Sequence, residues 1–327
     1  MYFAAATAAA ATALALAAYT RAAASQVSLG GGDDDGGGRG GGGGRKCISE
    51  SSANPISSQW PGWVTGNLNG TTIIVPIPFQ LARKVIPSEY EILQRAYQSL
   101  LPGLPAGRYP MMVSALFDHD VMLESANISL VDFSRAALEF PFVDRLRDGY
   151  SSFRWTATML ITEGSEAING SQGYGIRVHP ATFDPSCDAY KGRDKSSTTF
   201  TATASQTGRF LSLSLRPDYD YVPYPLDFIR NVTNQPTFAT SDHECDNYIR
   251  LFNTSLTQTP HMPVPVRADV RARLDPLASG GGGGDGEEEE QRWTDVYGWR
   301  LSTAFIEPPL PVSCQSLQGY SGTGPGD

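Results

Sequence analysis

The chain has 327 residues, 40% of them hydrophobic, so it can bury a sizeable core, and its low-complexity tracts reduce the ordered part to one large domain. The net charge of −9 comes mainly from acidic residues within two glycine-rich tracts, at positions 33–35 and 285–290. The remaining chain is close to charge balance, which argues against nucleic acid or an anionic membrane surface as a partner.

The N-terminus is typical of a secretory signal peptide. Residues 1–18 are an almost unbroken run of Ala and Leu without a basic n-region, and small residues suited to cleavage follow near Ala18 or Ala24. The run is short and Ala-dominated for a membrane span, and no later segment is long and apolar enough to cross a bilayer. We therefore predict a signal peptide over residues 1–24, a secreted, extracellular protein, and no integral membrane segment after cleavage.

Glycosylation sequons support export. The chain contains five N-x-S/T sequons among its nine asparagines, where chance would give roughly one or two. The predicted glycosylation sites are Asn69, Asn127, Asn169, Asn231 and Asn253.

The cysteines form an even set: Cys47, Cys187, Cys245 and Cys314. In an exported chain such a set favours two disulfides, and the lack of CxxC or Cys/His spacing argues against zinc. Three connectivities are open. Chain layout favours Cys187 with Cys245 and Cys47 with Cys314.

Two tracts are too rich in Gly and acidic residues to offset the entropy of ordering them. The first predicts a disordered linker over residues 25–46, and the second predicts a disordered loop over residues 279–290. The intervening and flanking sequence predicts a single domain over residues 47–327.

Most of this domain has a strand pattern, with β-branched, aromatic or alternating residues bounded by Gly, Pro or Asn. In residues 209–215 Leu and Ser alternate, which indicates a sheet buried on one side. The predicted strands are Thr71–Ile77, Met111–Phe117, Phe153–Ile161, Arg209–Leu215 and Asp295–Phe305.

Two helices are predicted. Ser88–Leu101 begins with Ser88 and Glu91 in capping-box positions and carries one apolar face, and Asp242–Phe252 has a similar box and face. Many strands with few helices and no βαβ alternation indicate an α+β fold, mainly antiparallel β, built as a barrel or sandwich with peripheral helices.

Three landmarks resemble those of acetoacetate decarboxylase-like proteins. They are residues 79–101, the GRYPM sequence at residues 107–111, and a later motif in which Arg135, Phe140 and Pro141 keep the family spacing. The resemblance covers residues 66–190, and the chain looks closest to a secreted fungal branch of that fold. It implies a β-barrel of the acetoacetate decarboxylase-like kind.

Family chemistry uses a lysine pair after Phe-Pro, one lysine forming a Schiff base and the other depressing its pKa. Here those positions are Phe142 and Val143, the family's motif glutamate falls on Met111, and another becomes Ala136. We therefore predict no Schiff-base decarboxylation.

The four lysines of the chain offer no good substitute for the family pair. They are Lys46, Lys84, Lys191 and Lys195. Only Lys84 is conceivable as a nucleophile, and a hydrated surface charge is the more frequent role of such a residue.

Asp118, His119 and Asp120 end a predicted strand. On an extended backbone the two aspartates share a face, where they could bind a cation or act as a base. The alternative, which we favour, is a strand-end turn with solvated carboxylates, because no third ligand is identifiable. No metal or cofactor is predicted.

Arg135, Glu139 and Arg154 lie among apolar residues of predicted strands. An arginine inside a barrel could bind a ligand carboxylate bidentately, with Glu139 orienting it or acting as acid or base. The alternative is a structural Arg/Glu ion pair.

The leading hypothesis is a secreted glycoprotein whose barrel binds a small organic acid or carbonyl ligand without decarboxylase activity. A second hypothesis is a lysine-independent lyase, hydratase or isomerase acting on a secondary metabolite, with Glu139, Asp118 or Asp120 as base. A third is a structural cell-surface protein. Convergence of Arg135 and Glu139 on one enclosed site would favour the first two. The sequence does not predict the oligomeric state.

Overall fold

The computed structural model describes residues 52–319 apart from 195, 241, 243 and 279–289. The predicted signal peptide and linker lie outside the described residues, as does the predicted loop 279–290 except for Glu290. In the part described, the chain is mainly β with four α-helices, which confirms the predicted α+β class.

The five predicted strands are present. They lie within β1 (Val64–Pro78), β3 (Arg108–Leu123), β6 (Phe153–Trp155) with β7 (Thr158–Thr162), β11 (Arg209–Pro217) and β15 (Gln291–Glu307). The other long strands are β5 (Phe133–Asp144), β8 (Arg177–Asp184), β10 (Thr198–Ala204) and β14 (Val264–Arg273). The short strands are β2 (Glu91–Ile92), β4 (Ile128–Ser129), β9 (Lys191–Gly192), β12 (Thr237–Phe238) and β13 (Ile249–Leu251).

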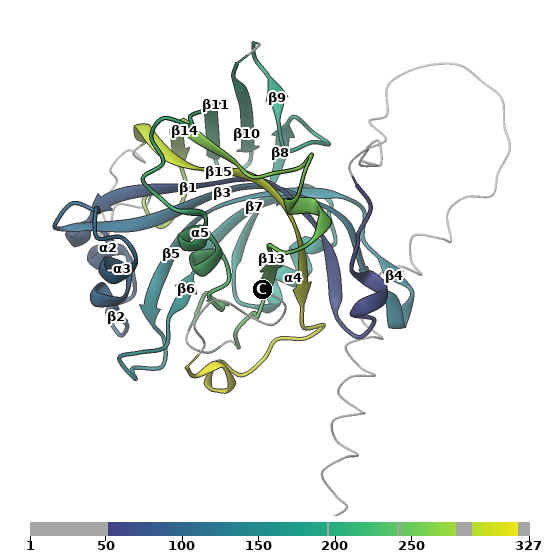
Figure 1. Ribbon diagram of the computed structural model, residues 1–327. Coiled ribbons are helices and arrows are strands. Elements are labelled where there is room, and N and C mark those ends of the chain that lie inside the picture. Colours follow the sequence, from purple (N-terminus) through teal and green to yellow (C-terminus); the bar gives the residue numbers. More distant parts are fainter. Residues whose placement is uncertain (1–51, 195, 241, 243, 279–289, 320–327) are drawn as a thin grey trace, which may run out of the picture. The chain divides into compact units, whose positions relative to one another are not determined.

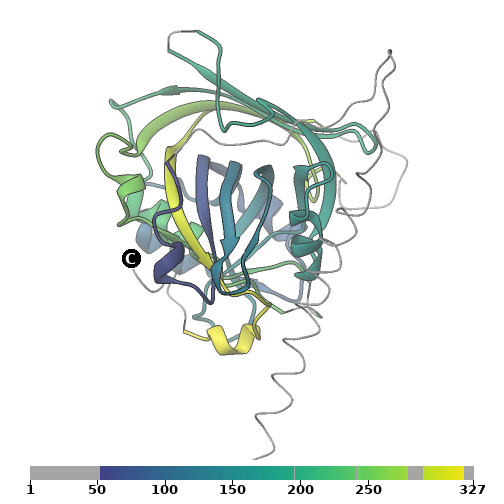
Figure 2. The same cartoon turned by 90° about the vertical axis from the view of Figure 1, so that its right-hand side faces the viewer.

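Nine of these strands close into a barrel in the order β5, β7, β8, β10, β11, β14, β15, β1 and β3, because β3 also pairs with β5. Figure 2 shows the strands as a ring. Every neighbouring pair is antiparallel except β7 and β8, which run parallel. The predicted barrel is thus confirmed, with mainly antiparallel strands.

The alternation of buried and half-buried side chains along the strands shows which side faces the barrel interior. On β11 the buried row is Leu211, Leu213 and Leu215, whereas the intervening serines are half-buried. Following the strand register from this row leads to Val113 on β3 and Leu138 on β5. These residues therefore face inward, and their neighbours in sequence face outward.

The outward face of β1, β3 and β5 is covered by the described residues of the stretch 225–252, all but 241 and 243, which we call the cover segment. It contains α5 (Leu226–Thr233), β12 and β13. β12 pairs parallel with β6 and β13 pairs antiparallel with β15, so the cover segment joins the sheet at two places. Figure 1 shows α5 and β13 of this segment. Polar residues on this part of the barrel wall are consequently buried.

The predicted helix over residues 242–252 is wrong. Cys245 forms an isolated bridge with Val312, and Ile249–Leu251 is strand β13. Ile249 and Leu251 pack in an apolar cluster with Ile306, while Arg250 points to the opposite side. Pairing to β15 therefore overrides the apparent capping box.

The predicted helix over residues 88–101 is correct only in its second half. Glu91 and Ile92 form β2, which pairs with Val143 and Asp144, and the helix begins at Gln94. The helices are α2 (Phe79–Val85), α3 (Gln94–Leu100), α4 (Ala167–Gly173) and α5, with 3-10 turns at Ser57–Gln59, Glu124–Ala126, Ser255–Thr257 and Cys314–Leu317.

The disulfide Cys245–Cys314, with Cα atoms 5.0 Å apart, ties the cover segment to the C-terminal turn. This pairing overturns both pairings that chain layout favoured. Cys187 is likewise engaged in a disulfide, and Cys47 lies outside the described residues.

Candidate functional site

Arg135, Glu139 and Arg154 come together on the outward face of the barrel wall. Arg135 and Glu139 are four residues apart on β5, which places them on one face of the strand. Arg154 on β6 lies with its Nε 2.7 Å from Oε2 of Glu139. Glu139 and Arg154 are 6% and 7% exposed, so the pair is buried beneath the cover segment.

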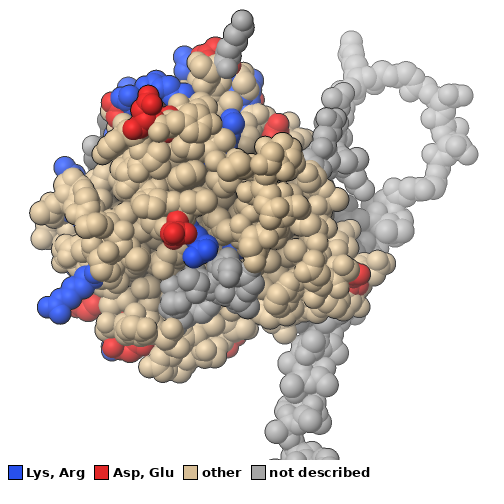
Figure 3. Space-filling model, viewed as in Figure 1, with Lys and Arg blue, Asp and Glu red and all other residues tan. Residues whose placement is uncertain are grey.

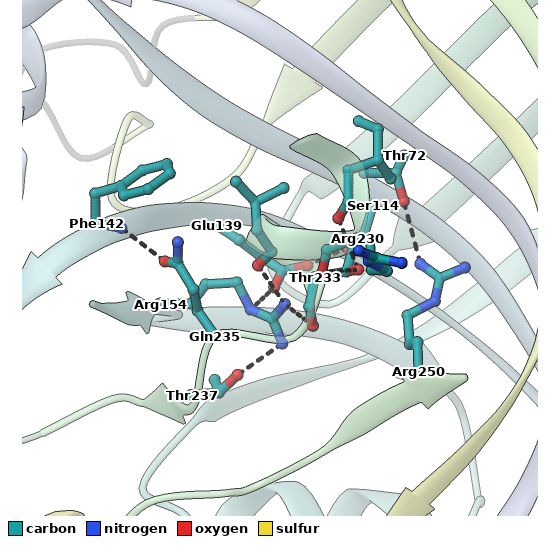
Figure 4. Close-up of polar contacts among 12 residues, drawn as sticks. Thr72, Ser114, Glu139, Phe142, Arg154, Arg230, Thr233, Gln235, Thr237 and Arg250 are labelled. Carbon is teal, nitrogen blue, oxygen red and sulfur yellow. Dashed lines mark hydrogen bonds and ion pairs between the residues drawn. The ribbon is translucent and has the colours of Figure 1, made fainter. Parts of the chain in front are cut away.

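The nitrogen atoms of the Arg154 guanidinium already contact acceptor atoms of the protein. It donates to the carbonyl oxygens of Val232 and Thr233 at 3.1 and 2.6 Å and to Thr237 Oγ1 at 2.7 Å (Figure 4). Oε1 of Glu139 accepts a hydrogen bond from Ser114 Oγ at 2.5 Å. The pair therefore acts as a clamp that fixes the cover segment to the barrel.

Arg135 forms a second ion pair beside this clamp. Its Nε lies 2.9 Å from Oδ2 of Asp118, and its guanidinium lies over the Tyr248 ring at 5.0 Å. Burial raises the pKa of the Asp118 carboxyl, and Arg135 opposes that rise. The Arg135 side chain is 20% exposed, so this part of the site is the part that contacts solvent.

Asp118 and Asp120 do not share a face. Asp120 has a positive φ of 50°, and its Oδ2 lies 2.8 Å from Nδ1 of His119. The left-handed backbone at Asp120 breaks the strand alternation on which the predicted shared face rested. Asp118 therefore belongs to the buried site with Arg135, and Asp120 belongs to the opposite side of the wall.

Arg250, on β13, is a further cation in the same region and was not predicted from the sequence. It is 2% exposed, and it donates from Nε to Thr303 Oγ1 at 3.0 Å and from Nη1 to Thr72 Oγ1 at 3.3 Å. Its Nη2 has no hydrogen-bond partner, and no carboxylate among the described residues forms an ion pair with it. Burial lowers the pKa of Arg250 to about 10, so the guanidinium is still protonated at neutral pH.

Asp246 and Tyr248 precede Arg250 at every second position of the extended cover segment. Asp246 Oδ1 and Tyr248 Oη are also buried without a hydrogen-bond partner. Burial raises the pKa of the Asp246 carboxyl well above its ordinary value of 3.8, and the neighbouring Glu307 adds to the rise. Asp246 therefore holds its proton well above the pH at which an exposed aspartate loses it.

Glu307, at the end of β15, completes this group. It accepts a hydrogen bond from Tyr174 Oη at 3.0 Å, and burial raises its pKa. We call the eight residues the outer-wall cluster: Asp118, Arg135, Glu139, Arg154, Asp246, Tyr248, Arg250 and Glu307. A cluster with paired cations, one unpaired cation and three carboxyls of raised pKa can bind an anion and exchange a proton with it.

The positions of the family's lysine pair lie in an aromatic environment. The Phe142 ring packs against Tyr97 and Phe228 at centroid distances of 5.8 and 6.1 Å, and Val143 is fully buried. Phe142 has a φ of 62°, and its N–H donates to Gln235 Oε1 at 2.8 Å. The chain thus has an uncommon left-handed backbone conformation at this position and a side chain that cannot form an imine.

Neither lysine that the structure describes lies in this region. Lys84 on α2 is exposed, and Lys191 is exposed and paired with Asp184 at 2.8 Å. Among the described residues, no three His, Cys, Asp or Glu side chains are placed to hold a metal ion.

Three predicted glycosylation sites are exposed, and two are not. Asn127, Asn169 and Asn253 are exposed to solvent. Asn69 and Asn231 are half-buried, and their side-chain oxygens accept hydrogen bonds from Ser302 Oγ at 2.6 Å and from Gln235 Nε2 at 3.1 Å.

The surface carries charges of both signs. On the face shown in Figure 3, acidic and basic residues are intermixed where they gather and are sparse elsewhere. One exposed pair of this kind joins Arg271 to Glu290 at 2.8 Å. No helix in the part of the chain described has the length and apolar character needed to span a bilayer.

Fold and site together define a closed β-barrel protein with a buried charged cluster held beneath a disulfide-linked cover segment. Comparison with protein-family models and with curated proteins finds no match to this chain.

Proposed function

We propose that the protein binds a small organic acid at the outer-wall cluster, with Arg250 as the residue that receives the ligand carboxylate. The observation that carries this proposal is the buried Arg250 guanidinium, which has an unpartnered Nη2 and no carboxylate partner among the described residues. An uncompensated charge in a protein interior is unfavourable, and a ligand carboxylate would offset that cost with charge-assisted hydrogen bonds.

Neighbouring groups would define the rest of the ligand. Tyr248 Oη and the Asp246 carboxyl each offer an unpartnered polar atom within the same cluster. Because burial raises its pKa, Asp246 holds its proton to a higher pH than an exposed aspartate does, and the protonated carboxyl can donate a hydrogen bond to a hydroxyl or carbonyl oxygen of the ligand. The preferred ligand is accordingly a small acid that carries a second oxygen function near its carboxylate.

In this proposal the protein is a secreted glycoprotein with an acetoacetate decarboxylase-like barrel and no Schiff-base chemistry. The closed nine-stranded barrel is compatible with that fold, and Phe142 and Val143 occupy the positions of the catalytic lysines. Reduction with borohydride in the presence of acetoacetate would trap no adduct, and a covalent adduct on Lys84 would contradict the proposal.

A second candidate function is a lysine-independent lyase, hydratase or isomerase. The raised pKa values of Asp246 and Glu307 favour it, since buried carboxyls of this kind can act as general acid or base at neutral pH. Chemical turnover of a bound acid that is lost in Asp246→Asn, while binding is retained, would select this function over binding alone.

Binding is tested by calorimetry and thermal unfolding with short hydroxy and oxo acids, each compared with the alcohol or ketone that lacks the carboxylate. We expect Arg250→Met to weaken binding at least tenfold, whereas Arg216→Met, which changes an exposed arginine on β11, leaves it unchanged. Without ligand, Arg250→Met should be at least as stable as the wild type, since it removes an unpaired buried charge. Equal affinity of the wild type and Arg250→Met would contradict the proposal.

A further inference from the structure

A second group of polar residues lies on the inward face of the same strands. Asn67 on β1 is opposite His119 on β3, and Ser134 on β5 is opposite Phe117, two residues before His119. Asn67, His119 and Ser134 are 0%, 1% and 0% exposed. They are therefore neighbours inside the barrel wall and fully separated from solvent.

Each of the three side chains presents one polar atom that has no hydrogen-bond partner. These atoms are Asn67 Oδ1, His119 Nε2 and Ser134 Oγ. Buried polar atoms in folded proteins are nearly always paired, so three adjacent unpaired atoms on neighbouring strands indicate a missing occupant.

The other polar atoms of these residues are held in place. Asn67 Nδ2 donates to the carbonyl oxygen of Ser52 at 2.7 Å, and the Ser134 N–H donates to Thr162 Oγ1 at 2.8 Å. Asp120 Oδ2 lies 2.8 Å from His119 Nδ1, and a neutral imidazole that donates from Nδ1 to this carboxylate presents Nε2 as a hydrogen-bond acceptor. The Asn67 amide and the His119 imidazole are thus held in place, and Ser134 lies on the strand next to that of His119.

The conformation of Asp120 argues for a ligand site over a packing defect. Asp120 adopts a φ of 50° to reach His119, and an uncommon backbone conformation of this kind costs free energy. A buried water that only filled a gap would need no oriented imidazole. The Phe117 ring, stacked on His119 at 5.8 Å, adds an apolar wall beside the polar atoms.

The occupant is chemically constrained by these atoms. Acceptor atoms repel an anion. The nearby carboxylates are already engaged: Asp120, which is 44% exposed, lies against the imidazole, and Asp132 Oδ1 accepts a hydrogen bond from the Asp120 N–H at 3.2 Å. Asp118 points to Arg135 on the opposite side of the wall. A neutral molecule that donates hydrogen bonds fits best.

We propose that Asn67, His119 and Ser134 form a second, internal site that binds a small neutral hydroxyl compound, an alcohol or a phenol, whose O–H donates to His119 Nε2. This site lies inside the barrel, whereas the outer-wall cluster lies outside it, so the two proposals stand independently.

Residues 52–56 cover this end of the barrel. Besides the Asn67 contact with Ser52, Asn54 Nδ2 donates to Thr65 Oγ1 at 3.0 Å and to the carbonyl oxygen of Asp120 at 3.2 Å, and Ile56 packs with Ile249 and Ile306. A ligand that enters from this end has to displace this cover to reach His119.

The test uses the full protein labelled with ¹⁵N at its four histidines. Phenol and propan-2-ol are the probes, and acetate and ammonium are the charged controls. We expect a saturable shift of the His119 Nε2 resonance with phenol or propan-2-ol and none with the ions. Saturation-transfer signals of the bound alcohol should fall at least tenfold in His119→Phe, which keeps the ring stacking and removes the acceptor, and persist in Arg250→Met.

Two results would overturn the proposal. One is an unchanged His119 resonance with both probes and a slowly exchanging water beside the imidazole, which would show that a buried water alone fills the site. The other is an equal response to acetate or ammonium. Ser134→Ala, which removes one unpartnered atom with little change in volume, serves as the second variant if His119→Phe does not fold, and it should also weaken the probe signals.

Discussion

Arg154 pairs with Glu139 at 2.7 Å while its two terminal nitrogens hold the backbone of α5 and the side chain of Thr237. One guanidinium thus neutralises a carboxylate of the barrel wall and satisfies the C-terminal carbonyls of a helix in the cover segment. Removing either charge leaves the other buried and unpaired, which is far more costly than removing both.

We expect Glu139→Met and Arg154→Met each to lower the free energy of unfolding by about 3–5 kcal/mol, and the double variant to lose less than the sum of the two. Urea unfolding measures all three. Lys191→Met, which breaks an exposed ion pair, is the matched control and should cost less than about 1 kcal/mol. Additive losses in the double variant would show that the pair does not act as a unit.

The buried Asp246 carboxyl predicts a dependence of stability on pH. Its pKa is raised in the folded chain, so the folded state binds the proton more tightly than the unfolded state does. The stabilisation is complete below the ordinary pKa of 3.8 and is lost as pH rises through the raised value. Asp246→Asn should therefore flatten the decline in unfolding free energy from about pH 4 towards neutrality.

Asp194→Asn is the control for this measurement. Exposed Asp194 has its pKa lowered by hydrogen bonds from Ser197 and Ser196, so its contribution to stability is lost only below pH 3.8. Its profile above pH 4 should match that of the wild type. The assignment to Asp246 fails if Asp246→Asn and wild type have parallel profiles over the same interval.

Exposure separates the five sequons into two groups. When the chain is expressed in a eukaryotic secretory host, we expect Asn127→Gln, Asn169→Gln and Asn253→Gln each to remove the mass of one glycan. Asn69→Gln and Asn231→Gln should leave the glycan mass unchanged, because those side chains are half-buried and hydrogen-bonded within the fold. Intact-protein mass spectrometry before and after enzymatic deglycosylation measures both; a glycan at Asn69 would contradict this division.

The Cys245–Cys314 disulfide closes a loop with a sequence separation of 69 residues. A cross-link over such a loop restricts the unfolded chain, so Cys245→Ser with Cys314→Ser should lower the free energy of unfolding by about 2–5 kcal/mol. A non-reducing peptide map should contain a peptide that joins Cys245 to Cys314. A peptide that joins Cys187 to Cys245 instead would refute the pairing.

The strands could be predicted because their signal is local. In Arg209–Leu215 each leucine faces the interior and each serine the outside, and burial follows the same period of two. Arg135 and Glu139 lie four residues apart on β5 and share one face. The sequence had singled out both, together with Asp118 and Arg154, and these four residues are half of the outer-wall cluster. It did not indicate that Arg154 would also bond to Val232, because that contact joins residues far apart in the chain.

Three further cluster residues were missed because residues 242–252 satisfy a helical pattern as well as a strand pattern. Asp246, Tyr248 and Arg250 alternate with Ile249 and Leu251, and this period of two was the available signal. Strand pairing with β15 and the Cys245 disulfide decide between the two patterns. Both contacts are made to residues far away in the chain, so the local sequence does not reveal them. Likewise, a single left-handed residue, Asp120, redirected its carboxylate to His119, which no periodicity predicts.

The disulfide also links ligand recognition to the redox state of the surroundings. Asp246, Tyr248 and Arg250 lie close after Cys245 in the chain, so the disulfide at that residue helps to hold this stretch in place, including Arg250 against Thr72 and Thr303. Reduction would loosen three of the eight cluster residues together while the barrel strands stay hydrogen-bonded. The proposed acid-binding site would then be fully assembled only in an oxidising compartment. A reductant would release the bound acid at a concentration that leaves the barrel folded.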